Sequence, residues 1–376
     1  TQRCCRRAPH GYGAEGISLP TVRMIIGTQI LDRKLPSVAE GLACDRLFLV
    51  LEERVAELHP DLLPQLQSAL PEAICRTLRG GEECKTTESL GLLWTWLSEE
   101  GATRRSALVL IGGGALLDLG GLAASTYMRG IATVYVPTTL LAMVDASVGG
   151  KTAIDFLGVK NLIGSFHPAH EVIVDIDFLR TLPLEELLSG YGEVVKHATL
   201  MGGEAWREVC RIGDPVGLMD EEWQALIEKR IAYKASIVEA DPTERGLRRI
   251  LNIGHTVGHA LEAYSHQNEF RRTLPHGEAV VFGLLIESYI TMCQRGTSKE
   301  YIRQLMTLAR ELYSPFFYTC KDYPELLRLM RHDKKNSVGT ITLMGVIEPG
   351  NIEAVEVADE GVIKEGLDFL RETFGS

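Results

Sequence analysis

The spacing of apolar residues differs between the first and the second part of the chain. In the first part, short runs that are apolar throughout alternate with segments of helical spacing. This alternation is typical of a parallel sheet whose strands are buried on both faces by the helices between them. We therefore predict strands at Val22–Ile26, Arg46–Leu51, Ala107–Ile111, Thr133–Val136 and Val172–Ile176.

Helical spacing dominates after Pro183, and the length of 376 residues fits two domains. We predict helices at Leu184–Leu200, Glu221–Glu239, Ile253–Tyr264 and His276–Arg295. One hairpin interrupts them, Gly339–Val346 with Ile352–Val357. The predicted fold is an α/β, Rossmann-like nucleotide-binding domain over residues 1–182, followed by a mainly α-helical metal- and substrate-binding domain over residues 183–376, with the active site between them.

Charge and cysteine usage narrow the class of protein. A net charge of −11 argues against a nucleic-acid partner, because nucleic-acid binders usually carry a basic face. No run of about 18 apolar residues occurs, so we expect no membrane span. The eight cysteines form no CxxC pair, which argues against both a disulfide framework and a cysteine zinc site. We therefore expect a cytoplasmic protein.

A glycine turn follows the apolar run Leu108–Ile111. Gly112, Gly113 and Gly114 lead into a segment of helical character, and glycines at such a junction let the backbone approach a pyrophosphate. The motif is not the GxGxxG fingerprint, and glycines at a strand end are often simply a turn. Asp118, one turn further on, would contact a ribose or nicotinamide, or would serve as a helix-start charge.

A polar segment follows the apolar run that ends at Val136. Its last part, Gly149–Thr152, resembles the end of a P-loop, but Asp145 stands where the GxxxxGK[ST] motif needs a glycine. The Walker interpretation therefore fails. The remaining interpretation is a flexible, glycine-rich loop that carries Asp145 and Lys151, and such loops more often bind a polar ligand than lie idle at the surface.

Four of the ten histidines fall between residues 255 and 276. His255 and His259 are four residues apart and share a helix face, a common geometry for two imidazoles that ligate one metal ion. The spacing therefore predicts a metal site at this segment. By itself it neither places His276 nor excludes His266.

In their order and spacing, these motifs resemble those of the 3-dehydroquinate synthases, which belong to the sugar phosphate cyclases. The resemblance runs from Gly81-Glu82-Glu83-Cys84-Lys85 to Asp333-Lys334-Lys335. It implies a carbon–oxygen lyase of the shikimate pathway that converts 3-deoxy-D-arabino-heptulosonate 7-phosphate to 3-dehydroquinate and phosphate. The family's reaction proceeds by transient oxidation of C5 by NAD, β-elimination of phosphate, re-reduction, ring opening and an intramolecular aldol closure.

The resemblance also implies site residues. It places the metal, Zn²⁺ or Co²⁺, on Glu193, His255 and His276, and it moves His259 to the substrate. It implies NAD contacts from Glu82, Lys85, Gly113, Gly114, Asp118, Thr138, Thr139, Asp145, Lys151, Lys160, Phe178, Thr181 and Leu182. It implies catalytic or substrate contacts from Lys151, Asn161, Lys196, Lys234, Glu244, Arg248, Asn252, His259 and Lys335.

Two further expectations follow from the resemblance. Arg129 would reach across the interface of a homodimer into the neighbouring subunit's site. One cofactor position departs from the family pattern: Leu51-Glu52 stand where the family usually has Thr-Asp, so the ribose contact would fall to Glu52.

Three other interpretations stay open. A sugar phosphate cyclase whose substrate lacks the carboxylate, such as a valiolone or inosose synthase, would not be expected to keep a carboxylate-binding arginine like Arg248, whereas an amino-dehydroquinate synthase would keep it. A metal-dependent polyol dehydrogenase would release NADH and would have no use for so many anion-binding residues. A non-catalytic relative would be expected to have lost metal ligands such as Glu193.

Overall fold

The chain folds around a six-stranded parallel sheet. The computed structural model describes residues 22–267, 270–331 and 340–375. The strands lie in the order β1 (Arg23–Gly27), β8 (Glu171–Asp175), β5 (Ala132–Pro137), β4 (Ala107–Gly112), β2 (Leu47–Glu52) and β3 (Ile74–Leu78). Five of them coincide with the predicted apolar runs to within one residue at each end, which confirms the predicted Rossmann-like fold class.

The sixth strand, β3, is absent from the sequence prediction. It pairs with β2 on one side and stands last in the strand order. Arg76 and Thr77 interrupt its apolar run, and its side chains are largely half-buried. A strand at the edge of a sheet needs no continuous apolar run, so the pattern that reveals the central strands does not apply to it.

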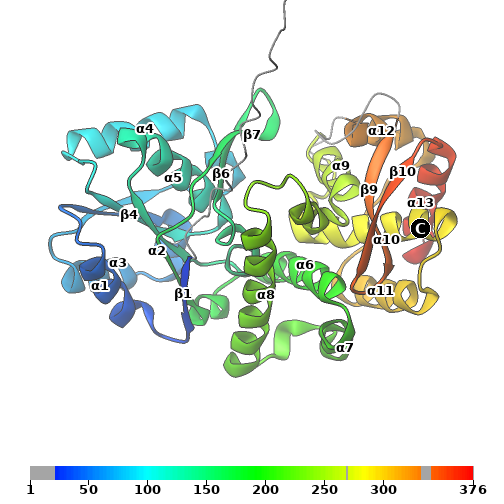
Figure 1. Cartoon of the computed structure of the whole chain (residues 1–376), viewed down its shortest axis with the longest axis horizontal. Helices are drawn as coiled ribbons and strands as arrows, with labels where there is room; N and C mark the ends of the chain where they lie inside the picture. The colour runs from blue at the N-terminus through cyan, green and yellow to red at the C-terminus, as the bar shows by residue number, and fades with distance from the viewer. Residues whose placement is uncertain (1–21, 268–269, 332–339, 376) are drawn as a thin grey trace, which may run out of the picture.

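Helices cover both faces of the sheet (Figure 1). The chain first moves toward one edge, from β1 to β3, and then reverses toward the other, from β4 to β8. Because parallel crossovers are right-handed, the reversal places the earlier helices on one face and the later ones on the other. The helices are α1 (Leu31–Gly41), α2 (Glu53–Leu58) and α3 (Leu62–Ala69), then α4 (Thr87–Glu99) and α5 (Gly114–Thr126).

A β-hairpin, β6 (Lys151–Phe156) and β7 (Val159–Phe166), replaces part of the predicted flexible loop. Its strands pair antiparallel, and Leu157 and Gly158 form the turn with φ of 51° and 76°, as a tight two-residue hairpin turn requires. The loop prediction is therefore wrong from Lys151 onward. In Figure 1 the hairpin stands between the sheet and the helical part of the chain.

The second part is helical except for one hairpin. All four predicted helices are confirmed, and so is the hairpin, as β9 (Ile341–Glu348) and β10 (Asn351–Val357). Gly339, at the predicted start of that hairpin, lies outside the described residues. The helices are α6 (Leu184–Met201), α7 (Gly203–Ile212), α8 (Asp220–Ala240), α9 (His255–Ser265), α10 (His276–Gln294), α11 (Lys299–Leu312), α12 (Tyr323–Arg331) and α13 (Glu360–Thr373).

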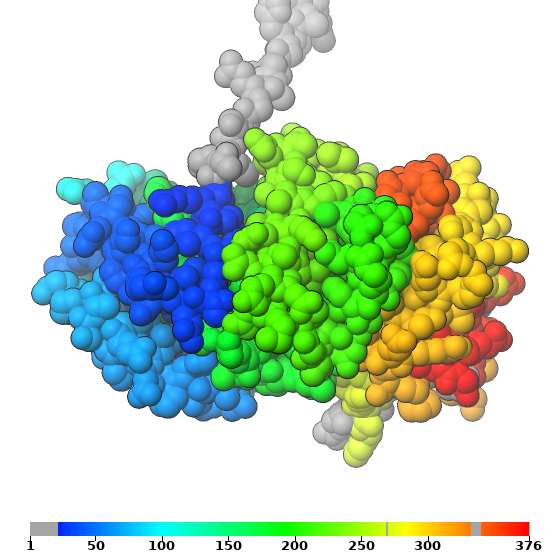
Figure 2. Space-filling view, turned by 90° about the horizontal axis from the view of Figure 1, so that it is seen from below, coloured from blue at the N-terminus to red at the C-terminus, as the bar shows by residue number. Residues whose placement is uncertain are grey.

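Helix α10 is the centre of the helical part. It packs against α6, α9, α13 and β9, and most of its side chains are buried. In the space-filling view of Figure 2, the green segment that contains α6 to α8 lies between the blue N-terminal surface and the orange and red C-terminal surface. Within the described ranges, no helix is both long enough and apolar enough to span a membrane.

Candidate functional site

The carboxyl edge of the sheet gathers most of the residues expected to contact NAD. The carboxyl ends of parallel strands share one edge, so residues that follow different strands come together there. Glu52 ends β2; Glu82 and Lys85 follow β3; Gly113, Gly114 and Asp118 follow β4; Thr138, Thr139 and Asp145 follow β5; Phe178, Thr181 and Leu182 follow β8. This placement is the one that a dinucleotide site in a Rossmann-like sheet requires.

Glu52 lies against the glycine turn, between β2 and β4, where the chain reverses its direction across the sheet. Gly113, the N-cap residue of α5, donates its backbone N–H to Glu52 Oε2 (2.7 Å). A Cβ at Gly112 would lie 2.7 Å from the same oxygen, so this close approach needs glycine. Burial raises the pKa of Glu52, although the hydrogen bond from Gly113 opposes the rise. A dinucleotide bound at this helix N-terminus would therefore lie directly beside Glu52.

Lys85 and Asp118 form an ion pair next to the glycine turn. Lys85 Nζ lies 2.9 Å from Asp118 Oδ2 and 3.5 Å from Glu82 Oε1, and it also donates to the side-chain oxygen of Asn161. Burial raises the pKa of Asp118 to about 6, against the opposing effect of Lys85. The resemblance implies that Asn161 contacts the substrate and that Lys85 contacts NAD. In the structure these two side chains contact each other.

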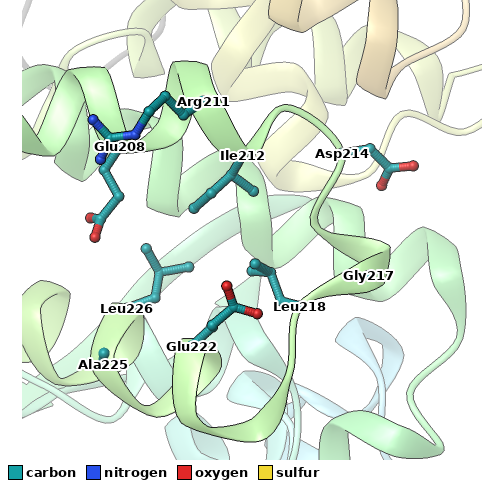
Figure 3. A pocket seen from close by; sticks show the side chains of 9 residues that line it. All are labelled: Glu208, Arg211, Ile212, Asp214, Gly217, Leu218, Glu222, Ala225 and Leu226. Carbon is teal, nitrogen blue, oxygen red and sulfur yellow. The ribbon is translucent and has the colours of Figure 1, made fainter.

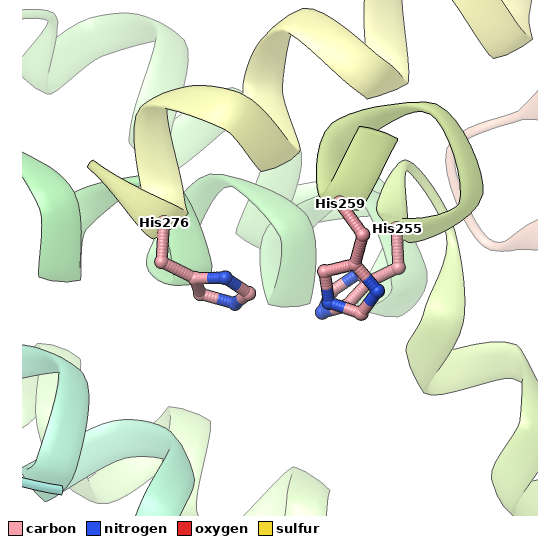
Figure 4. Close-up of side chains that lie close together, drawn as sticks. All are labelled: His255, His259 and His276. Carbon is pink, nitrogen blue, oxygen red and sulfur yellow. The ribbon is translucent and has the colours of Figure 1, made fainter. Parts of the chain in front are cut away.

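Three imidazoles converge in the helical part (Figure 4). His255 begins α9, His259 lies one turn later, and His276 begins α10. Their ring centroids are 5.1 to 5.6 Å apart, and one nitrogen from each lies within 4.8 Å of the others. His266 is exposed at the C-cap of α9, outside this group. The structure therefore brings His255 close to His259, as the helical spacing predicts, and also close to His276, as the family resemblance implies.

Glu193 from α6 joins the imidazoles at the position that the resemblance implies for a ligand. Its Oε1 lies 3.6 Å from His255 Nε2 and 3.5 Å from His276 Nε2. The side chain is fully buried, and Oε1 accepts no hydrogen bond from the described residues. A carboxylate oxygen buried without a hydrogen bond is costly unless positive charge lies nearby; here Lys196 and His276 supply it, and a bound metal ion would supply it as well.

Hydrogen bonds at Nδ1 turn both Nε2 atoms toward Glu193. His255 Nδ1 donates to the carbonyl oxygen of Ile253 (3.0 Å), and His276 Nδ1 donates to Glu262 Oε2 (3.1 Å). Metal-ligating histidines usually have such a partner on the other ring nitrogen, because it fixes the tautomer and the ring direction. The donor set therefore has the form of a metal centre with its supporting contacts.

The two imidazoles differ in their charge. Burial and the nearby Lys196 ammonium hold the pKa of His255 well below its usual range, so this ring is neutral. Burial also disfavours the charged form of His276, but the carboxylates of Glu262 and Glu193 outweigh it and raise its pKa to about 10. A divalent cation bound here would have to displace that proton, so it would bind less tightly as the pH falls.

Two buried lysines and two carboxylates lie beside the imidazoles. Lys196 Nζ forms an ion pair with Glu193 Oε2 and lies 3.6 Å from Asp145 Oδ1. Lys234 Nζ lies 2.8 Å from the same Asp145 oxygen and donates to the Asp145 carbonyl (2.6 Å). Asp145 and Glu193 also lie near buried His197, which makes a second group of potential ligands, but the Lys196 ammonium already stands between the two carboxylates.

The other expected substrate residues lie along the segment before α9. Glu244, whose φ is +58°, forms an ion pair with Lys151 at the start of β6 and accepts a hydrogen bond from Asn252 Nδ2 (2.7 Å). Arg248 is buried, and its guanidinium donates to the carbonyl oxygens of Pro242 (2.8 Å) and Gly149 (3.1 Å). These contacts connect the helical part with the hairpin and the segment just before it.

Two expected residues remain, Lys335 and Arg129. Lys335 lies outside the described residues. Arg129 is exposed in the short helical turn Tyr127–Arg129 after α5, where Met128 and Arg129 both have positive φ, 50° and 70°. A residue that acts on a neighbouring subunit is expected to be exposed within its own chain.

Sequence reasoning missed two carboxylates. Glu262 lies seven residues after His255, on the same face of α9, and this spacing was a usable signal. Glu287 on α10 accepts hydrogen bonds from the backbone N–H groups of Gly254 (2.7 Å) and Val257 (3.0 Å), and so anchors the start of the helix that carries His255. No sequence spacing predicts this second contact, because it joins two helices.

A groove lies apart from these residues, between α7 and α8 (Figure 3). Its volume is about 560 Å³. It shares no lining residue with the imidazole cluster or the carboxyl edge of the sheet, so we assign it no part in the site. The lining consists of Glu208, Arg211, Ile212, Asp214, Gly217, Leu218, Glu222, Ala225 and Leu226.

Comparison with known proteins agrees with this geometry. Residues 75–189 match the family model "3-dehydroquinate synthase N-terminal", and residues 190–336 match "3-dehydroquinate synthase C-terminal". A 3-dehydroquinate synthase from Parabacteroides distasonis is 39% identical over 92% of this chain and 97% of its own length. One from Alkaliphilus metalliredigens is 36% identical over 87% of this chain and 91% of its own length.

Solved structures share the fold at lower identity. A 2-deoxy-scyllo-inosose synthase complexed with carbaglucose-6-phosphate, NAD+ and Co2+ has a TM-score of 0.80 at 24% identity, over 93% of this chain and 96% of that one. The 2-epi-5-epi-valiolone synthase of Streptomyces hygroscopicus, with NAD+ and Zn2+ bound, has a TM-score of 0.81 at 22% identity, over 96% and 99%. On the two family models and the full-length relatives, the chain belongs to the 3-dehydroquinate synthase family.

Proposed function

We propose that this protein is a 3-dehydroquinate synthase, a carbon–oxygen lyase that converts 3-deoxy-D-arabino-heptulosonate 7-phosphate to 3-dehydroquinate and phosphate. Membership of the family supports the activity. The observation that carries it at the site is the convergence of Glu193, His255 and His276 beside buried Lys196 and Lys234. This arrangement combines a cation site with positive charges for an anionic sugar phosphate.

The residues fit both expected cofactors. Zn²⁺ or Co²⁺ would be held by the buried Oε1 of Glu193 and by Nε2 of His255 and of His276, whose Nδ1 atoms each donate a hydrogen bond. Three protein ligands leave a further coordination position for the substrate. The glycine turn at the start of α5 suits the pyrophosphate of NAD. When bound, NAD supplies a hydride acceptor and donor at C5, and the divalent cation polarises the hydroxyls at C4 and C5.

The chain's own residues bind and orient the substrate. Lys151, Arg248, Asn252, His259 and Lys335 are proposed to contact its phosphate and carboxylate, because cations and N–H groups recognise such anions. Glu244 and Glu193 are proposed to hold the ring hydroxyls, with Lys196 and Lys234 beside them. Asp145 keeps both lysines in place: burial disfavours its charge, yet the two ammonium groups hold the pKa of Asp145 well below its usual range.

We also propose a cytoplasmic homodimer with two domains that meet near residue 182. The six cysteines in the described part of the chain are free, which suits a reducing compartment. The hairpin exposes apolar side chains along both strands and in its turn, and a second copy that packs on it would shield them from water: Phe156, Leu157, Val159, Leu162, Ile163 and Phe166. The proposed boundary lies in the segment between the end of β8 at Asp175 and the start of α6 at Leu184, which is consistent with a change from sheet to helices there.

The proposal is tested by phosphate release from 3-deoxy-D-arabino-heptulosonate 7-phosphate, with and without a chelator. We expect activity to need the metal and to return with Zn²⁺ or Co²⁺. Arg248→Ala should lower kcat/KM by about 10- to 100-fold, since hydrogen bonds to charged groups contribute about 1.5–3 kcal/mol. Arg245→Ala, an exposed arginine in the same segment, is the matched control and should keep its activity. Full activity in the chelated enzyme would contradict the proposal.

A further inference from the structure

One carboxylate joins the metal centre to the cofactor side of the molecule. Glu262, on α9, is buried, and each of its two oxygens has a different partner. Oε2 accepts from Nδ1 of His276 (3.1 Å), and Oε1 accepts from Nζ of Lys160 (2.7 Å). Lys160 belongs to β7 of the hairpin that lies between the sheet and the helices in Figure 1.

The hydrogen bond to Glu262 determines what His276 can offer a cation. An imidazole that donates from Nδ1 to a carboxylate keeps its Nε2 lone pair for coordination. That Nε2 atom lies 3.5 Å from Glu193 Oε1, in the middle of the donor set. Without Glu262, the ring of His276 would be free to flip or to adopt the other tautomer.

The two imidazoles are held by unequal means. The partner of His255 Nδ1 is the backbone carbonyl of Ile253, which no side-chain substitution removes. The partner of His276 Nδ1 is a side chain, and that side chain is in turn held by a lysine from the hairpin. The orientation of His276 therefore depends on the side chain of Glu262, and through Lys160 it depends on the position of the hairpin.

We propose that Glu262 is a positioning residue of the metal centre, which fixes the tautomer and direction of His276, and that Lys160 holds Glu262 in place. The inference rests on the proposed function, because it concerns the same metal. It gives Lys160 a role besides its expected NAD contact. It also makes the affinity for the metal depend on contact between the β6–β7 hairpin and α9.

The test is Co²⁺ binding by the metal-free full chain, followed through the visible absorption of the ion, with no substrate present. Glu262→Ala should lower the Co²⁺ affinity by about 10- to 100-fold, the usual effect of removing such a supporting partner. Glu262→Gln should lose less, because its amide oxygen still accepts from Nδ1, and Lys160→Met should also lose less, because Glu262 itself remains.

A matched control separates support of the metal from loss of stability. Glu208 also binds two cations from the helical part, Lys229 and Arg230 (3.1 Å to Arg230), far from the imidazoles in the chain and with no contact to them. Glu208→Gln should lower the melting temperature of the metal-free protein and leave the Co²⁺ affinity unchanged. Should Glu262→Ala fail to fold, Glu262→Gln and Lys160→Met carry the test.

Equal Co²⁺ affinity in wild type and all folded variants of Glu262 and Lys160 would overturn the inference. So would an equal loss in Glu208→Gln, because the effect would then follow stability alone. Failure of the proposed function has a different signature: the wild type would bind Co²⁺ and yet release no phosphate from the heptulosonate phosphate.

Discussion

At the scale of single residues, the two buried lysines of the site differ in the pH at which they lose their charge. Lys196 and Lys234 share the carboxylate of Asp145, but Lys196 has Glu193 as a second partner. Burial and the neighbouring Lys196 ammonium lower the pKa of Lys234 to about 8, whereas Glu193 and Asp145 outweigh burial and raise the pKa of Lys196. Lys234 is thus the cation that titrates just above neutral pH.

The first prediction concerns the pH dependence of substrate binding. Below about pH 8 Lys234 is charged and, in its proposed role, would attract the anionic substrate; above that pH the charge is lost. We expect KM to rise by roughly tenfold as the pH is raised from about 7 to about 9, since a charge-assisted contact contributes about 1.5–3 kcal/mol. Initial rates of phosphate release measure it. Lys234→Arg, which keeps its charge, should flatten the profile, and a flat wild-type profile would contradict the assignment.

At the scale of elements, the metal centre depends on how closely α6 approaches α10. A Cβ at Gly192 would lie 2.2 Å from the carbonyl oxygen of Gly277, and one at Gly277 would lie 1.7 Å from that of Ser189. Glu193 and His276 are the immediate neighbours of these two glycines in the chain. The backbones must therefore be in contact for Glu193 to reach the imidazole.

The second prediction follows from that contact. Gly192→Ala should push α6 away from α10, lower the free energy of unfolding by about 1–3 kcal/mol, and weaken Co²⁺ binding at the same time. Gly91→Ala is the matched control, because Gly91 also lies in a helix and a Cβ there meets nothing within 4 Å. Thermal melting and Co²⁺ titration measure the two effects. Unchanged metal affinity in a folded Gly192→Ala variant would contradict the role given to this packing.

The same elements show what could be predicted from the sequence. Apolar runs and helical spacing located five strands and four long helices, because their burial repeats along the chain. They missed β3 and the β6–β7 hairpin, which are edge or exposed elements without such a pattern. Spacing paired His255 with His259, but the contact of Glu193 with His276 arises from tertiary packing, and only the family resemblance anticipated it.

At the scale of the whole molecule, the site is formed where the two parts of the chain meet. Lys151 and Lys160 on the hairpin pair with Glu244 and Glu262 in the helical part. Arg248 donates to the carbonyl of Gly149. The proposed assembly adds a third contributor, since Arg129 is exposed and would act on a second copy. Local patterns in one sequence cannot predict that kind of contact, because it lies outside the chain.

The third prediction tests this shared site by mixing two inactive variants. Arg129→Ala lacks the crossing arginine, and His255→Ala lacks a metal ligand. Because half of the dimers in an equal mixture are hybrids, and each hybrid has one complete site, co-folding should restore about a quarter of the wild-type activity. Each variant alone is the control. No recovery in mixtures shown to contain hybrid dimers would contradict the crossing role of Arg129.

We propose that one metal-dependent site uses NAD and regenerates it in each turnover. This proposal is tested by following phosphate and NADH together during conversion of 3-deoxy-D-arabino-heptulosonate 7-phosphate by the metal-loaded enzyme. We predict phosphate release in step with substrate consumption, with NADH never exceeding the amount of enzyme, and loss of both signals after chelation. NADH that accumulates with turnover, or phosphate release that persists without metal, would contradict this mechanism.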